Sequence, residues 1–455
     1  MRFCLVFPLV VLMVSSGFVQ PVTAEEGDEE KAPNSILAKY DKGFRFSTKD
    51  NAYALRINGG IQIRYTYVDY DPAIRYNQED YSNFFVRRAR LYFSGHVGST
   101  KFAYLLHIQL EPNQGLNAND LWVEYEFSDW FRLGAGRNKI SYGLEMLNSG
   151  SALGLVERSV MYGETDIDLG NASEPGPKYP GGGTNRFGLS SSAYGTGFAT
   201  GGLNLYRSQG IQLRGNKGSA TTSTFEYQLG LWQGRSTNSL ANSGSDHLMS
   251  LRVGYHPWGF VDWKVVGDVE GSEHFKIGIL GSIYTNRSDD PEKYKEGGTN
   301  LALMARWHGW SADIEWARES FDYEDSAVPF DREGWRLSLG WYVVPEKWEI
   351  RARYAENQRL KDPSYYAAVN SGLLTPEVWD GEDWATALEA KISELSIGAS
   401  VRILGWRNKL VFDLSRLTRE FAADPDAVIG GESAPIAKAP NQVDHRVRAM
   451  VQLVF

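Results

Sequence analysis

Arginine and lysine recur at alternating positions along many segments of this 455-residue chain. In an extended strand, residues two apart point to the same face, so these cations would line one side of a sheet. A guanidinium group stays charged and binds oxyanions through two parallel hydrogen bonds. We therefore expect a pore lining that attracts anions, formed by Arg56, Arg64, Arg87, Arg88, Arg90, Lys101, Arg132, Arg336, Arg351, Arg353, Arg402, Arg446 and Arg448.

The double arginine at positions 87 and 88 constrains how this lining is built. Strict alternation places Arg88 and Arg90 on one face, whereas Arg87 joins them only near a strand end or at a β-bulge. Carboxylates occupy the same faces in smaller number, so we expect a net basic lining although the chain carries a net charge of -9. The alternative is that these cations are solvated or paired with acids and give little selectivity. The acids on these faces are Glu111, Asp120, Glu124, Glu126, Glu226, Asp313, Glu315, Glu349 and Asp413.

The elements that must position the cations are β-strands. At the carboxyl end, Val447, Val451 and Phe455 fall on one face, and Arg446 and Arg448 fall on the other. Segments of roughly ten residues with this alternation recur along the chain, which is typical of a transmembrane β-barrel. The pattern predicts an all-β, antiparallel barrel of about sixteen strands, whose polar faces line water and whose apolar faces meet lipid.

The connections between these segments alternate between short and long. This alternation is expected for a barrel with short periplasmic turns and long external loops. One connection, residues 257–273, is longer than the scheme requires. The longest connection, residues 140–208, either folds into the lumen and narrows it or stays outside as a surface loop.

The amino-terminal residues predict export. Arg2, an apolar run over 5–14 and small residues up to Ala24 form a secretory signal peptide over 1–24, cleaved near Ala24. We expect an acidic periplasmic segment over 25–50 and the barrel over 51–455. Cys4 lies in the signal peptide and is the chain's one cysteine, so a disulfide framework is excluded.

Signatures of catalysis are weak. The histidines lack metal-ligand spacing, and the Gly134-Ala135-Gly136 stretch precedes a strand-like segment rather than a helix. Two pairs of acids, Asp313 with Glu315 and Glu124 with Glu126, could be imagined as a glycosidase acid and base, but no second feature supports this role. We therefore expect no enzyme, no cofactor and no catalytic or metal-binding residue.

Two motifs bring a known family into view. Residues 85–91 read Phe-Val-Arg-Arg-Ala-Arg-Leu, and residues 133–145 read Leu-Gly-Ala-Gly-Arg-Asn-Lys-Ile-Ser-Tyr-Gly-Leu-Glu. Together with residues 43–48, 55–59 and 157–159, they resemble the phosphate-selective porin O and P family. The resemblance implies a sixteen-stranded, trimeric outer-membrane porin with a ladder of arginines and an inward loop. Arg87 and Arg88 match the family's double arginine, whereas Gly60 stands where the family has a further arginine.

The expected function is passive diffusion of small anions, phosphate among them, through the outer membrane. An outer-membrane channel for general solutes, sugars or cations is an alternative. A secreted soluble carbohydrate-binding or carbohydrate-active all-β protein is an alternative of another class. The expected partners are a homotrimer, outer-membrane lipid, small anions, and the barrel assembly machinery acting through Phe455; we expect no nucleic acid.

Overall fold

The structure is a computed structural model of the chain. It describes residues 35–69, 80–110, 117–162, 205, 207–219, 221–234, 247–288, 294–323, 330–359, 377–379, 384–386, 388–404, 407–422, 428–429, 432–433 and 441–455. The predicted signal peptide, its cleavage site near Ala24 and the acidic residues 25–34 lie outside these ranges.

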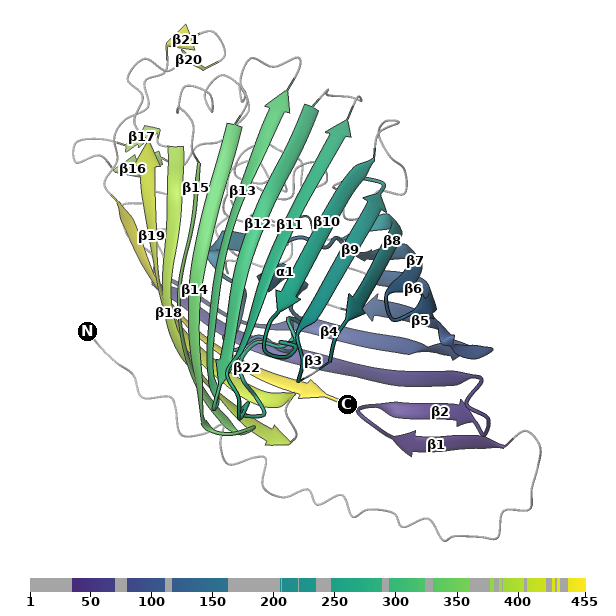
Figure 1. Cartoon of the computed structure of the whole chain (residues 1–455). Helices are drawn as coiled ribbons and strands as arrows, with labels where there is room; N and C mark the ends of the chain where they lie inside the picture. The colour runs from purple at the N-terminus through teal and green to yellow at the C-terminus, as the bar shows by residue number, and fades with distance from the viewer. Residues whose placement is uncertain are drawn as a thin grey trace.

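Sixteen antiparallel strands form a closed barrel, as the alternating pattern predicts. Each strand pairs with the next along the chain, and the last returns to the first (Figure 1). The strands are β3 (Ala54–Asp69), β4 (Tyr81–Val97), β5 (Ser99–Gln109), β6 (Asn117–Ser128), β7 (Phe131–Lys139), β8 (Arg207–Lys217), β9 (Thr224–Trp232), β10 (Leu248–His256), β11 (Lys276–Ser288), β12 (Tyr294–Trp307), β13 (Trp310–Tyr323), β14 (Phe330–Val344), β15 (Trp348–Arg359), β18 (Leu388–Leu404), β19 (Asn408–Ala422) and β22 (Gln442–Val454).

The seam between β22 and β3 closes the barrel. The register runs from His445 opposite Asp69 to Val454 opposite Gly60. Closure satisfies the backbone groups of both terminal strands, which a hydrocarbon environment could not do.

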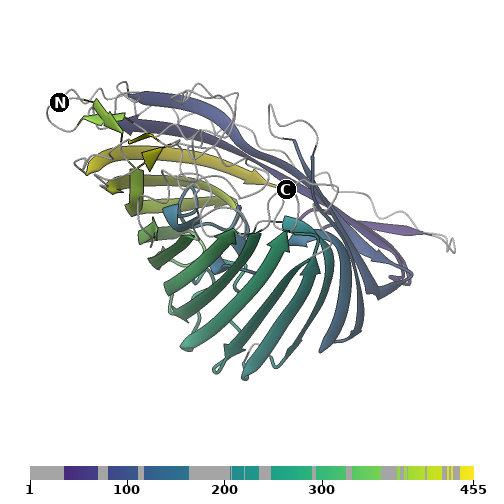
Figure 2. The same ribbon diagram turned by 90° about the horizontal axis from the view of Figure 1, so that it is seen from above.

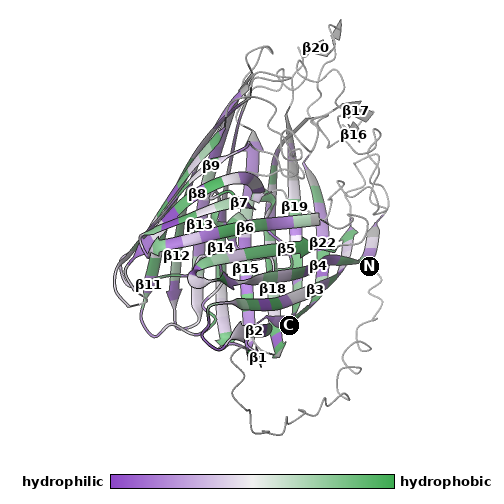
Figure 3. Cartoon of the chain, turned by 90° about the vertical axis from the view of Figure 1, so that its right-hand side faces the viewer, coloured by the Kyte–Doolittle hydropathy of each residue, from purple (hydrophilic) through white to green (hydrophobic). Residues whose placement is uncertain are grey.

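The two faces of the wall differ as the period of two requires. Along β18, Leu395 and Ile397 are 57% and 56% exposed, whereas Glu394 and Ser396 are 0% and 1% exposed. The same alternation is visible as apolar and polar bands on neighbouring strands (Figure 3). Apolar side chains outside and polar side chains inside are the arrangement of a barrel in lipid.

The connections of the barrel separate into two ends. Short turns join β12 to β13 and β14 to β15, where His308, Gly309 and Glu346 adopt positive φ. Two small strand pairs, β16 (Glu377–Trp379) with β17 (Trp384–Thr386) and β20 (Val428–Ile429) with β21 (Glu432–Ser433), lie in long connections at the other end (Figure 1). We call these the short-turn end and the long-loop end.

Helical structure is sparse in the described ranges. It amounts to α1 (Leu144–Leu147) and the 3-10 turn η1 (Val160–Tyr162). Neither of these elements, nor any other helix in the described residues, has the length and apolarity needed to cross a membrane.

Before the barrel begins, the chain forms a hairpin, which the strand pattern did not predict. Strands β1 (Ile36–Tyr40) and β2 (Phe44–Thr48) pair with each other, and β2 pairs with the first residues of β3. Strand β22 pairs with β3 only as far as Gly60, and β2 pairs with the residues of β3 before that point. The hairpin lies close to the carboxyl terminus (Figure 1). The expected acidic segment 25–50 thus includes two strands that extend the sheet.

Candidate functional site

Residues 140–162, which we call the inward segment, fold into the barrel. Nearly all of them are buried, and viewed from above the segment that carries α1 lies inside the ring of strands (Figure 2). Of the two alternatives for the longest connection, its first part therefore follows the one in which it folds into the lumen. Residues 163–204 lie outside the described ranges. The lumen is narrowed by this segment.

Polar contacts at α1 fix the first half of the inward segment. The Leu144 and Glu145 amides donate hydrogen bonds of 2.5 and 3.2 Å to the Glu315 carboxylate of β13. At the other end of α1, Lys139 Nζ donates to the carbonyls of Met146 at 2.7 Å and Asn148 at 3.0 Å. Each charge thus meets the backbone groups that a short helix leaves unpaired.

Three wall arginines converge on Glu157 of the inward segment. Its Oε1 accepts hydrogen bonds from Arg64 at 2.7 Å and from Arg87 Nε at 2.5 Å, and its Oε2 accepts one from Arg88 at 2.8 Å.

A β-bulge makes this convergence possible. Gln62 lies opposite Arg88 and Ile63 lies opposite Val86, so the register of the β3–β4 ladder shifts at Arg87. An extra residue inserted in one strand lets two consecutive side chains turn to one face. Strand alternation predicted that Arg87 faces inward only near a strand end or at a β-bulge, and the structure has a bulge there.

Glu145 makes the second carboxylate contact between the inward segment and the wall. Arg353 lies 3.2 Å from Glu145 Oε1, and Arg336 lies 3.8 Å from Oε2. Burial alone would raise the pKa of Glu145, but these two guanidinium groups and hydrogen bonds from Ser159 outweigh it and hold the pKa below its usual range.

The remaining predicted cations of the inner wall also meet partners. Five of them are almost fully buried, with side chains directed into the barrel. Arg336 pairs with Glu315 at 2.7 Å, Arg351 with Glu349 at 2.5 Å, Arg446 with Glu394 at 3.2 Å and Arg448 with Asp413 at 2.7 Å, while Arg402 donates to the Tyr342 hydroxyl. This part of the wall matches the salt-bridged alternative considered from the sequence.

Three predicted cations lie toward the short-turn end. Arg56 pairs with Asp41 of the hairpin turn at 3.0 Å and remains about one-third exposed. Lys101 is exposed at the start of β5. Arg132 pairs with Glu126 at 2.7 Å. The sequence prediction therefore placed in one group the cations that lie beside the inward segment and the cations that lie near the short-turn end.

A cavity of about 190 Å³ lies between the β3–β4 wall, β22 and the inward segment. Three guanidinium groups line it, those of Arg88, Arg90 and Arg407. Asp and Glu are absent from the described residues around it, and the other polar groups are amides and hydroxyls. Gly60, where the family resemblance implies an arginine, also borders this cavity. We call it the arginine cavity.

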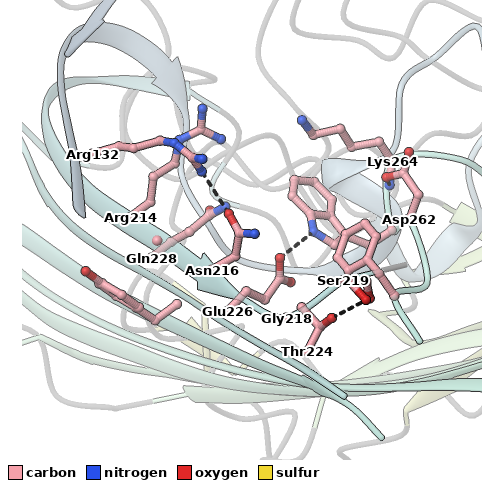
Figure 4. A pocket seen from close by; sticks show the side chains of 14 residues that line it. Arg132, Arg214, Asn216, Gly218, Ser219, Thr224, Glu226, Gln228, Asp262 and Lys264 are labelled. Atoms are coloured by element: carbon pink, nitrogen blue, oxygen red, sulfur yellow. Dashed lines mark hydrogen bonds between the residues drawn. The ribbon is translucent and has the colours of Figure 1, made fainter. Parts of the chain in front are cut away.

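A second cavity, of about 420 Å³, lies at the short-turn end between β8, β9 and residues 257–275. Figure 4 shows Arg132 and Arg214 on one side of it and Lys264 and Asp262 on the other. It holds charges of both signs, since Glu226 and Asp262 line it as well. We call it the mixed cavity.

Residues 257–275, which we call the long turn, explain the one connection that did not fit the scheme. They turn into the lumen and meet the inward segment, where Asn148 donates to the Trp263 carbonyl and the Ser149 amide donates to that of Lys264 at 3.4 Å. An apolar cluster of α1, Val261, Trp263 and inward residues of β11 and β12 joins the two. The long turn, from the short-turn end, and the inward segment, from the long-loop end, therefore contact each other inside the lumen.

Several residues of the site were missed from the sequence. Glu394 lies two residues before the inward Ser396 in β18, so the period of two could have identified Glu394 as inward. Glu145, Glu157 and Arg407 lie in connections, where alternation gives no direction. Glu145 and Glu157 belong to stretches that carry the family resemblance, which was the available signal.

Comparisons with known proteins agree with this architecture. The model of the family described as phosphate-selective porin O and P matches residues 56–202, which confirms the resemblance over that part of the chain. No curated protein matches the chain.

Three similar solved structures have low sequence identity to this chain. The anion-selective porin from Comamonas acidovorans is 11% identical, with 88% of this chain and 100% of that chain covered and a TM-score of 0.54. The outer-membrane expressed OmpT of Vibrio cholerae is 10% identical, with coverages of 92% and 100% and a TM-score of 0.47. OprB of Pseudomonas putida is 10% identical, with coverages of 87% and 94% and a TM-score of 0.48.

The match to a porin family over residues 56–202 agrees with the barrel fold. The closed barrel with an apolar outer face also favours a membrane protein over the soluble alternative. The chain is therefore a closed antiparallel β-barrel with an apolar outer face, and its residues 56–202 match the family described as phosphate-selective porin O and P.

Proposed function

We propose that this chain is a passive diffusion channel for small anions, with phosphate among its solutes. The observation that carries the proposal is the arginine cavity, where Arg88, Arg90 and Arg407 face the same space and Asp and Glu are absent from the described lining. Such a space raises the local concentration of anions and lowers that of cations.

The order of the cations along β4 supports a pathway. Arg87 lies toward the long-loop end and Arg90 toward the short-turn end, with Arg88 between them. Arg88 contacts both Glu157 of the inward segment and Gln62, which borders the arginine cavity. An anion passing along this strand would exchange one guanidinium for the next. Conduction requires several moderate sites rather than one tight site.

The proposal gives the other predicted cations a lesser role. Arg336, Arg351, Arg353, Arg446 and Arg448 each lie beside a buried carboxylate, which cancels much of their field. They anchor the inward segment and the wall. Selectivity is therefore expected to depend on the cavity that Arg88, Arg90 and Arg407 line together, where the described lining holds no carboxylate, and not on the whole ladder.

A reversal potential in planar bilayers tests this function. Under a potassium chloride gradient the wild-type channel should show anion preference, and Arg90→Glu should shift the reversal potential toward cations. The shift should be largest at low salt, because screening shortens the reach of wall charges at high salt. Arg318→Gln removes a guanidinium from the outer face, where Arg318 pairs with Asp331, and should leave the reversal potential unchanged. Equal ion preference in wild type and Arg90→Glu would refute the proposal.

A general or sugar-permeable channel is the second candidate. The mixed cavity favours it, since charges of both signs and the rings of Phe260, Trp263 and Tyr227 line that space. Aromatic rings beside polar groups suit an uncharged, partly apolar solute. A reversal potential near zero together with faster sugar uptake by proteoliposomes would favour this candidate over the anion channel.

We also propose the assembly that the family resemblance implies. The barrel is expected to form a homotrimer in outer-membrane lipid, after cleavage near Ala24 and insertion by the barrel assembly machinery. The size of the detergent-solubilised protein would test the trimer, and mass spectrometry of the mature amino terminus would test the cleavage site.

A further inference from the structure

His256 is the last residue of β10, and its ring holds the first part of the long turn. The Val261 amide donates a hydrogen bond of 3.2 Å to His256 Nδ1, and the centroid of the Phe260 ring lies 4.8 Å from that of the imidazole. Because a backbone N–H can only donate, Nδ1 must carry a lone pair in this arrangement. The hydrogen bond to the long turn therefore exists only while the imidazole is neutral.

The other ring nitrogen, Nε2, has no hydrogen-bond partner among the described residues. The side chain is fully buried, and the Glu226 carboxylate lies 3.8 Å from Nε2, which is beyond hydrogen-bond distance. With Nδ1 as the acceptor, the ring proton is on Nε2. A buried donor left unpaired costs free energy, and a movement of the ring toward Glu226 would recover that cost.

Glu226 connects this ring to the contact between the long turn and the inward segment. Its Oε2 accepts a hydrogen bond of 3.2 Å from Trp263 Nε1, and Arg252 lies 3.3 Å from its Oε1. The Trp263 carbonyl accepts from Asn148 of the inward segment, and Val261 and Trp263 share an apolar cluster with α1. The two turn residues that meet α1 are thus held by one histidine and by the acid beside it.

Protonation of His256 would weaken both of these contacts. A charged imidazole donates from both nitrogens, so Nδ1 loses its bond from Val261. Nε2 then forms a charge-assisted bond to Glu226, for which Trp263 competes. We propose that His256 is a pH-sensitive switch for the long turn. The neutral ring keeps the turn against the inward segment, and the protonated ring releases the turn so that the lumen widens.

The charged groups around His256 come from the elements that pack against it. Glu226 of β9 is the acid within ion-pair distance in the described part of the chain. On β11, Gly278 lies directly against the ring, since an added Cβ would come within 2.8 Å of Nδ1. The other charged side chains nearby are Arg252 of β10, which reaches Glu226, Asp262 and Lys264 of the long turn, which line the mixed cavity with Glu226, and Lys276 of β11. Glu226 is thus the acceptor that a protonated ring reaches first, and the other charges influence the pH at which it does so.

Swelling of liposomes in arabinose measures the release of the long turn, because a neutral sugar does not respond to an added charge in the lumen. Histidine changes charge between about pH 5 and 8, so the rates are compared across that range. Swelling should be faster in acid, as the open fraction rises about fivefold, the effect of one lost hydrogen bond. A rate that stays constant across the range in the wild-type protein would overturn the inference.

The His256→Asn variant separates the switch from other titrating groups. The asparagine Oδ1 can replace Nδ1 as the acceptor for the Val261 amide, and an amide does not titrate. The variant should therefore keep its neutral-pH swelling rate in acid. The matched control is His274→Asn, which changes an exposed histidine of the same long turn and should keep the acid response. Retention of the acid response in His256→Asn, or its loss in both variants, would overturn the inference.

Hydrogen exchange of the wild-type protein tests the same contact without a variant, and so decides the matter if His256→Asn fails to assemble. After correction for the intrinsic effect of pH on exchange, the Val261 amide should be protected near about pH 8 and lose that protection near about pH 5. An amide that stays protected in acid would refute the switch. The inference rests on the proposed function only in assuming that solutes pass through the lumen. A channel without anion preference would refute that function, yet loss of Val261 protection in acid would still establish the switch.

Discussion

Gly59 and Phe455 exchange both of their backbone hydrogen bonds, at 3.1 and 3.0 Å, and so tie the carboxyl terminus into the seam of the barrel. The Phe455 ring lies beside Gly59, where an added Cβ would come within 3.0 Å of the ring and 2.6 Å of the Arg90 carbonyl. Small residues at such close approaches cannot be enlarged without moving the backbone.

The first prediction follows from this contact. Gly59→Ala should destabilise the folded barrel by about 1–3 kcal/mol through overpacking. Gly281→Ala is the matched control, because a Cβ there would meet its nearest side chain at 3.6 Å. Urea unfolding in detergent micelles would measure both. Equal stability of the two glycine variants would show that the seam is not tightly packed. Deleting Phe455 removes the same contact and should slow membrane assembly.

The second prediction concerns the lipid face. Ile397→Arg places a charge on an outward residue that is 56% exposed and should cost about 2–4 kcal/mol if the position lies near the membrane midplane. Ser94→Arg should cost much less, since Ser94 borders the arginine cavity. Gln62 would be a poor control, because it is buried and bonds to Gly150 and Gln452. Equal losses of folding free energy would mean that the faces are assigned wrongly.

Much of the fold could be predicted because the period of two acts locally. Alternation alone determines which side chains of a strand face lipid, and it assigned Arg88, Arg336 and Arg448 to the inside. It failed for the hairpin, where β1 and β2 span five residues each and are too short for a clear pattern. The turn residues Lys42 and Gly43, both at positive φ, were the remaining signal.

The candidate site could not be predicted to the same degree. The path of the inward segment depends on contacts between residues distant in the chain, such as Glu145 with Arg353 and Lys139 with the end of α1. A loop's own composition does not encode such partners. The pairing of wall arginines with carboxylates likewise depends on which residues face each other across the lumen. Within the site, strand alternation predicted one local feature, a strand end or a bulge at Arg87.

The third prediction concerns the long turn. Trp263 is buried, donates to Glu226 at 3.2 Å and lies under the Arg252 guanidinium, 3.9 Å from the ring centroid. Trp263→Ala should cost about 3–5 kcal/mol of local stability and loosen the contact with the inward segment. Single-channel conductance should rise. Trp258→Ala, which alters an exposed ring at the start of the same turn, should leave the conductance unchanged. A rise of the same size in both variants would exclude Trp263 as the closing contact.

The fourth prediction concerns pH. Because Arg336 and Arg353 hold the pKa of Glu145 below its usual range, against the effect of burial, the folded state binds this proton less readily than the unfolded state. The contribution of Glu145 is therefore complete above the pKa of an unfolded glutamate and is lost as pH falls through the lowered folded value. Wild-type unfolding free energy should exceed that of Glu145→Gln at neutral pH, and the difference should shrink below about pH 4. Urea titrations of both proteins over this range would measure it. A difference that stays constant down to the lowest pH would show that the Glu145 charge does not hold the inward segment to the wall.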